Sequence, residues 1–288
     1  MSQIEIYRAR RGSEVSAESA AAIAAVVSPF TIEVRFLGGL TDTQKDAFKA
    51  AADRWSSVIV GDLPSVQVGG EVIDDVLIEA QGDDIDGVNG ILGQAGPTHL
   101  RPASAGAAAF LPVKGVMTFD TADLDSMEQN GTLRDVITHE MGHVLGIGTI
   151  WAKKGLLQNG GTNNPTFTGA RAMEEFGVLK GTGPTPVPVE NTGGQGTADG
   201  HWRETVFRNE LMSGFIAAPG NPLSRVTAAS LEDLGYVVDM DAAEPFELPN
   251  NLLELAESGS LMAHIAPINV GIMLPSIPLV MPDESVQP

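Results

Sequence analysis

Residues 139–143 read His139-Glu140-Met141-Gly142-His143, and this pattern constrains the chain more than any other feature. An α-helix places residues i and i+4 on one face, so both imidazoles would lie side by side. Zinc is bound by neutral imidazole nitrogens at about 2 Å. Glu140 follows the first His and can reach a metal-bound water without ligating the metal itself. The pattern therefore predicts a metalloprotease-type helix that carries its own general base.

The flanking residues favour a helix from about Leu133 to about Leu145. Thr132 is a suitable N-cap, and Asp135 three residues later makes an imperfect capping box. Gly146 predicts the helix-ending turn. An apolar stripe has helical spacing, at Leu133, Val136, Ile137, Met141, Val144 and Leu145. The alternative is a buried helix with two structural histidines.

Two histidines do not complete a catalytic zinc site, which usually takes three protein ligands and one water. The longer pattern H-E-x-x-H-x-x-G-x-x-H would place a third His at position 149. Position 149 is Thr149, a poor zinc ligand. The other histidines are His99, His201 and His264, and His201 is the best candidate for the third ligand.

The sequence around His201 resembles the leishmanolysin-like peptidases of the metzincin clan. In that family an insertion separates the glycine of the zinc helix from the third His, and a His-Trp segment leads into a Glu-Leu-Met turn. Here His201 lies 58 residues beyond His143 (201 − 143). His201-Trp202 is followed by Glu210-Leu211-Met212. The resemblance implies one Zn²⁺ per chain, bound by His139, His143 and His201. It also implies that Glu140 is the catalytic base and that Met212 is the Met-turn residue beneath the metal.

The resemblance extends from about Phe30 to about Pro249. Residues 115–120 resemble the strand that borders a metzincin cleft, and residues 231–236 resemble the C-terminal helix of bacterial members. The chain has no Cys, so the disulfides and the cysteine latency of secreted members are impossible here. Some metzincins carry a Tyr two residues past the Met, where this chain has Gly214.

We expect an α+β fold, a metzincin-like zincin with four segments. Residues 1–29 form an N-terminal segment, and residues 30–150 form the N-terminal catalytic lobe, with a mixed sheet and two long helices, one of which is the zinc helix. Residues 151–249 hold an insertion and the C-terminal catalytic lobe. This lobe is largely irregular, because residues 152–200 carry eleven Gly and four Pro, and it ends in a short helix. Residues 250–288 form an apolar, Pro-rich tail.

Several elements are predicted from local patterns. Residues 31–37 alternate as a strand, and Thr41-x-x-Gln44 is a capping box that begins a helix to about Val58. Residues 72–80 indicate one buried strand. The other predicted elements are a mixture of loop and short strands over 87–106, a helical patch over 170–176, and a helix over 227–234 closed by Gly235.

Charge and composition limit the partners and the location. The formal charge of −20 repels phosphates, so we expect no nucleic-acid partner. Four prolines interrupt the apolar stretch 261–282, which predicts no membrane-spanning segment. Three arginines precede residues 20–27, but Glu14 and Glu18 intervene, so an N-terminal helix is favoured over a signal peptide. The family resemblance favours an extracellular or cell-surface location, and the oligomeric state stays open.

The predicted function is a zinc-dependent endopeptidase acting on an extended polypeptide, which would pair beside the strand at 115–120. One alternative is a non-proteolytic zinc-binding adhesion or surface-binding module on a protease scaffold. Another is a zinc hydrolase acting on a small amide. Glu140 argues against the binding module, which needs no base at that position.

Overall fold

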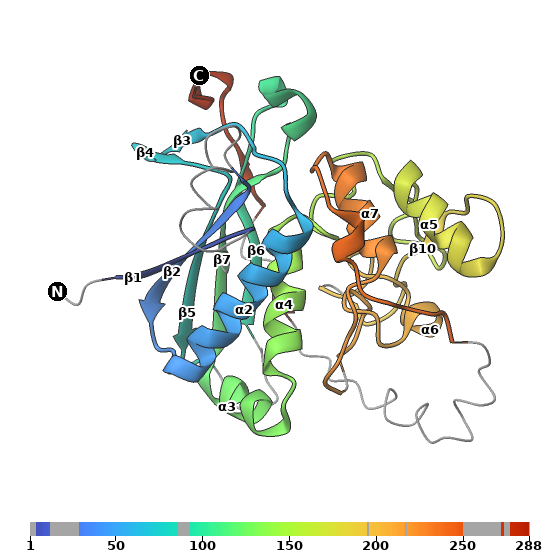
Figure 1. Cartoon of the computed structure of the whole chain (residues 1–288), viewed down its shortest axis with the longest axis horizontal. Helices are drawn as coiled ribbons and strands as arrows, with labels where there is room; N and C mark the ends of the chain where they lie inside the picture. The colour runs from blue at the N-terminus through green and yellow to red at the C-terminus, as the bar shows by residue number, and fades with distance from the viewer. Residues whose placement is uncertain are drawn as a thin grey trace.

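A computed structural model describes residues 4–11, 29–85, 93–194, 196–216, 218–249, 272–273 and 277–287. Figure 1 shows a sheet with helices α2, α3 and α4 on one side of the molecule, and helices α5, α6 and α7 on the other. The α+β class expected from the sequence is confirmed. Within the described residues, no helix is both long and apolar enough to cross a membrane.

The main sheet has seven strands in the order β1-β2-β5-β7-β6-β11, and β12 also pairs with β6. Strands β2, β5 and β7 are parallel to one another, and β6 runs antiparallel to β7. β1 is antiparallel to β2. The strand bounds are β1 Glu5–Arg10, β2 Thr31–Gly38, β5 Val76–Asp83, β6 Gly93–Leu100, β7 Pro112–Asp120, β11 Ile272–Met273 and β12 Leu279–Val280.

Two helices expected from the sequence pack against this sheet, α2 (Asp42–Val58) and α4 (Leu133–Val144). The capping box at Thr41 and Gln44 is present, so the predicted start of α2 is confirmed. Trp55 joins the two helices, because its indole N–H donates to the carbonyl of Thr138 at 2.8 Å. The same side chain is fully buried in the core.

The prediction of two long helices missed α3, which spans Thr121–Asn130. Its signal is weak because Leu124 and Met127 are its only buried apolar residues. The helix depends instead on Asp120, whose side chain accepts the Ala122 backbone N–H at 2.8 Å.

The prediction of one strand over 72–80 is wrong. The segment divides into β4 (Glu71–Ile73), which pairs with β3 (Val66–Val68), and β5. Asp75 separates them with a left-handed backbone φ of 42°. Its buried carboxylate accepts the N–H groups of Thr31 and Leu63, at 2.7 and 2.8 Å. These two tertiary bonds hold a kink that local periodicity does not predict.

Residues 87–106 were expected to mix loop with short strands. The described part contains the eight-residue β6, followed by the 3₁₀ turns η1 (Ala103–Ala108). β6 lies beside β7, so residues 115–120 are interior to the sheet, with β5 on one edge and β6 on the other. The expectation that residues 115–120 border a cleft is therefore wrong.

The C-terminal half is irregular, as expected, and its core is aromatic. Trp151 stacks on Trp202 at 4.7 Å between ring centroids, and Phe176 stacks on Phe207 at 5.4 Å. The expected short helix near its end is α7, and Gly235 closes it at φ 112°. The elements are β8 Leu157–Gln158, β9 Thr166–Phe167, α5 Ala170–Lys180, β10 Val187–Pro188, α6 Glu204–Phe207, α7 Arg225–Leu234 and η2 Met240–Ala242.

Near the two ends of the chain, the described residues join the sheet. β1 lies within the predicted N-terminal segment, whereas the predicted helix over 20–27 falls outside the described residues. The predicted tail contributes β11, β12 and the 3₁₀ turn η3 (Asp283–Ser285). These described parts of the tail therefore lie against the sheet.

Arg101 generates a stability prediction, because its buried guanidinium donates to the carbonyls of Pro64, Pro112 and Asp75, at 3.1, 2.5 and 2.7 Å. Arg101→Met should lower the free energy of unfolding by at least about 3 kcal/mol, since three carbonyls lose their donor. The matched control is Arg8→Met, because the exposed ion pair between Arg8 and Glu33 should contribute less than about 1 kcal/mol to stability. Urea unfolding measures both variants, and equal midpoints would contradict the prediction.

Candidate metal centre

The helix that carries the motif begins where α3 ends. Gly131 closes α3 in the left-handed region at φ 80°. The capping box predicted at Thr132 is wrong, because Thr132 is already helical and its side chain caps nothing. Its N–H and hydroxyl instead donate to the Asn130 side chain, at 3.0 and 2.6 Å. The short connection between the two helices leaves no extended residue to act as N-cap.

The other end of α4 turns sharply. Gly146 follows with φ 109°, and its N–H donates to the carbonyl of His143 at 3.1 Å. Gly148 has φ 74°, and a Cβ there would lie 2.0 Å from the carbonyl oxygen of Gly200. Only glycine at 148 allows the backbone before His201 to approach this turn. No local sequence pattern predicts this close approach.

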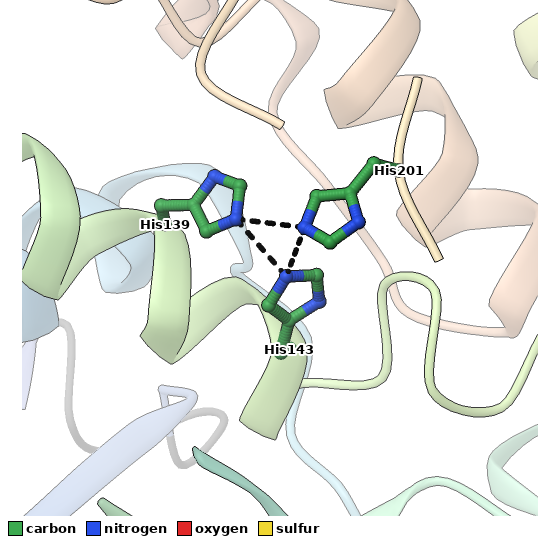
Figure 2. Close-up of side chains that lie close together, drawn as sticks. All are labelled: His139, His143 and His201. Carbon is green, nitrogen blue, oxygen red and sulfur yellow. Dashed lines mark hydrogen bonds between the residues drawn. The ribbon is translucent and has the colours of Figure 1, made fainter. Parts of the chain in front are cut away.

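Three histidine rings meet between the two halves of the molecule. Figure 2 shows His139 and His143 projecting from α4 toward His201, which lies on a separate segment. The Nε2 atom of His139 is 3.0 Å from that of His143 and 3.0 Å from that of His201. The remaining pair, His143 and His201, is separated by 2.9 Å. All three side chains are buried.

The second nitrogen of each ring fixes its tautomer. The Nδ1 atoms of His139, His143 and His201 lie 2.6, 2.9 and 2.8 Å from backbone carbonyl oxygens. These oxygens belong, in the same order, to Leu211, Ile147 and Thr197. A carbonyl can only accept, so each Nδ1 carries the proton and each Nε2 presents a lone pair.

Three lone pairs therefore converge without a proton between them, and a cation is the partner they require. The group could hold a metal ion. Three imidazoles around a tetrahedral zinc would place their nitrogens about 3.3 Å apart, close to the separations observed. Neutral, borderline-soft imidazole nitrogens also suit zinc better than calcium or magnesium, which prefer oxygen ligands.

Burial keeps the three imidazoles neutral. Burial, and to a smaller extent the neighbouring rings, lower the pKa of His139, His143 and His201 to about 3. A neutral ring is the form that ligates a metal. At neutral pH the site therefore needs little proton release before a metal binds.

Glu140 lies beside this cluster and is also buried. Its Oε1 atom is 3.8 Å from Nε2 of His139. Its Oε2 atom has no hydrogen-bond partner among the described residues. Burial raises the pKa of this carboxyl well above its usual value. An unsatisfied buried carboxyl next to three lone pairs is suited to hold a water that the metal also contacts.

Met212 packs under the motif helix. A Cβ on Gly142 would lie 2.8 Å from the Met212 sulfur and 2.9 Å from Trp55 Cζ2. Only glycine at position 142 therefore leaves room for the Met212 side chain against this helix. The Met212 sulfur lies against the part of the helix between His139 and His143. The backbone N–H of Trp202, next to His201, donates to the Met212 carbonyl at 2.9 Å. The turn at Met212 therefore contacts both the motif helix and the segment that carries His201.

The carboxylate of Glu210 holds that turn in place and is completely buried. Oε2 accepts the Met212 N–H at 2.6 Å. Oε1 accepts the N–H and hydroxyl of Ser224 and the hydroxyl of Thr227, at 3.0, 2.7 and 2.5 Å. Thr227 in turn accepts the Trp202 indole N–H at 2.8 Å. Glu210 therefore acts on the site through the backbone of this turn.

The other candidates lie elsewhere. The hydroxyl of Thr149 donates to the His143 carbonyl at 2.8 Å and is not a ligand. His99 lies in β6, and its ring Nδ1 is 3.0 Å from the Thr98 hydroxyl. His264 falls outside the described residues. A second group that could hold a metal ion consists of Asp62, Asp74 and Asp75. Its one buried carboxylate, that of Asp75, already accepts two backbone N–H groups.

Comparison with known proteins agrees with this geometry. No curated protein matches the chain. The model of the leishmanolysin peptidase family matches residues 107–253, just over half of the 288 residues. The match includes the motif helix, His201 and the turn at Met212. With its buried cluster of three histidines, this chain belongs to the leishmanolysin family.

Proposed function

We propose that the protein is a zinc-dependent endopeptidase, with His139, His143 and His201 as ligands of one Zn²⁺ and Glu140 as general base. The observation that carries the proposal is the convergence of three Nε2 lone pairs beside a buried carboxyl oxygen that has no partner among the described residues. Family membership supports it and implies the metzincin fold. The proposed lobes, 30–150 and 151–249, would each supply ligands, and the described parts of residues 1–29 and 250–288 add strands to the sheet of the first lobe.

A bound zinc would supply Lewis acidity, activating water and polarising the scissile carbonyl. Glu140 accepts the proton of the attacking water and later donates it to the leaving amine. A nearby cation lowers the pKa of a buried carboxyl, so the proposed metal would restore the basic form of Glu140. The carbonyls of Leu211, Ile147 and Thr197 keep each ring in the ligating tautomer throughout.

The proposed substrate is an extended polypeptide, as a peptidase family implies. It cannot pair with β7, because β5 and β6 already occupy both edges of that strand. The outer edge of β6 is the alternative. A Cβ on Gly115 would lie 2.4 Å from Val144 Cγ1 and 2.8 Å from the Gly96 carbonyl oxygen. The last turn of α4, with His143, therefore lies against the middle of β6, and strand addition there would bring a peptide near the cluster.

A binding module on the same scaffold is the alternative function. Glu140 makes no described hydrogen bond through Oε2, so it has no structural role that would explain a buried carboxyl. Hydrolysis of casein, measured with and without a chelator, distinguishes the two functions. Zinc binding without chelator-sensitive cleavage would favour the binding module.

His201 provides the first test of the ligand set. His201→Ala should lower zinc affinity and abolish hydrolysis, because only two helical imidazoles remain. His99→Ala is the control for the ligand set and should keep one zinc per chain. Zinc content by mass spectrometry and cleavage of a quenched peptide measure both properties. Full zinc and activity in His201→Ala would refute the assignment.

Glu140→Gln tests the base. The amide preserves size but cannot accept a proton, so zinc stoichiometry and the fold should be unchanged. Loss of general-base catalysis should lower kcat by about two to four orders of magnitude. A variant that hydrolyses peptides at nearly the wild-type rate would rule out the mechanism.

Substitution of Met212 tests whether its apolar packing against the motif helix affects zinc binding. Met212→Leu keeps volume and apolarity and should cost less than about 1.5 kcal/mol of stability, with zinc affinity unchanged. Met212→Ser should weaken zinc binding, because a polar group and a cavity replace the packing against Gly142. Zinc dissociation constants of the folded variants decide the question. An unaltered constant in Met212→Ser would remove Met212 from the site.

A further inference from the structure

The C-terminal segment of this chain lies on the outer edge of β6. β7 occupies the inner edge along its length, so both tail strands must use the opposite edge. β11 pairs with it at Gly93 and Gln94, and β12 pairs at His99 and Leu100. The Met281 N–H also donates to the Leu100 carbonyl at 2.9 Å.

The end of the tail is anchored beyond β6. Val286 forms an antiparallel bridge with Val66, and the Gln287 N–H donates to the Ser65 carbonyl at 2.8 Å. Met281 and Val286 pack on a small apolar cluster separate from the main core, formed by Val66, Ile73, Leu77 and Val113. Apolar contact and backbone pairing together hold this segment against the sheet.

This placement leaves little of the edge for another chain. The two pairings take both ends of the eight-residue strand and leave at most residues 95–98 between them. Typical paired strands are about 5–6 residues long. A polypeptide that adds to β6 must therefore displace at least one tail strand.

We propose that the outer edge of β6 is a peptide-docking surface whose occupant in cis is the described part of the C-terminal segment, residues 272–273 and 277–287, which competes with the polypeptide substrate. The inference rests on the proposed function. A tethered segment competes at a millimolar effective concentration, so weak pairing is enough to regulate access. Release of the tail exposes the edge beside the last turn of α4, and its return closes that edge.

A reversible lock tests the proposal. Val66 and Val286 are opposite residues of an antiparallel bridge, a geometry that a disulfide can span, and the chain has no other cysteine. The Val66→Cys/Val286→Cys pair is placed in a Glu140→Gln background loaded with zinc, so that binding is measured without cleavage. The probe is intact fluorescein-labelled casein, an unfolded chain that offers many extended segments.

Oxidation should raise the Kd for casein by at least about tenfold over the same protein treated with a phosphine reductant, because the locked tail cannot leave. Met281→Pro removes the N–H that donates to Leu100 and should lower the Kd below that of the Glu140→Gln parent. Ile277→Ala, an exposed change in the same segment, is the matched control and should leave the Kd unchanged. Zinc content and circular dichroism verify that each variant is folded.

Equal Kd values for the oxidised and reduced forms would overturn the proposal, as would absence of casein binding in every form. Failure of the proposed function has a different signature. The protein with Glu140 intact would then fail to cleave casein whether the tail is locked or free.

Discussion

Three imidazole nitrogens held about 3 Å apart, each with its lone pair directed inward, are the constraint on which the rest of the structure depends. Such an arrangement is unfavourable without a cation, since three acceptors face one another in a buried site. It persists because each ring is fixed from behind by a backbone carbonyl. The tautomers, and therefore the ligating atoms, follow from the path of the main chain.

Two of these supporting carbonyls come from segments far from the motif helix. Leu211 belongs to the turn that Glu210 holds, and Thr197 lies before His201. Glu210 connects that turn to α7 and, through Thr227, to Trp202. The stacked aromatic core around Trp151 and Trp202 gives this half a rigid base despite its short strands. The irregular half is thus as important to the geometry of the site as the helix that carries the motif.

The sheet contributes an edge as well as a platform. Its last full strand, β6, runs antiparallel to β7 and lies against α4, so its outer edge is where we propose that an extended chain adds. An open edge is also a site for unwanted pairing. The described part of the C-terminal segment covers both ends of that edge, so protection of the protein and control of access to the proposed site would follow from the same contacts.

The sequence by itself determined the parts whose signals are local. Residues 139–143 specify two imidazoles on one helix face and a carboxyl on the adjacent residue, because helical periodicity alone sets the spacing of His139 and His143. The capping box at Thr41 and the alternation over 31–37 likewise needed no tertiary information. His201 and Met212 were identified through resemblance to a family. No helical or strand periodicity relates them to His139 and His143, which lie at least 58 positions earlier.

Only the tertiary structure decided the features that depend on contacts between distant segments. Asp75 divides a predicted strand because the N–H groups of Thr31 and Leu63 bind its carboxylate. Residues 115–120 became an interior strand because β6 pairs with their outer edge, and a strand order cannot be read from one strand's own residues. The role of Glu210, the close approach at Gly148 and the position of the tail on β6 are set by packing across the fold. A local pattern determines which side chains share a helix face, whereas long-range packing determines what those side chains meet.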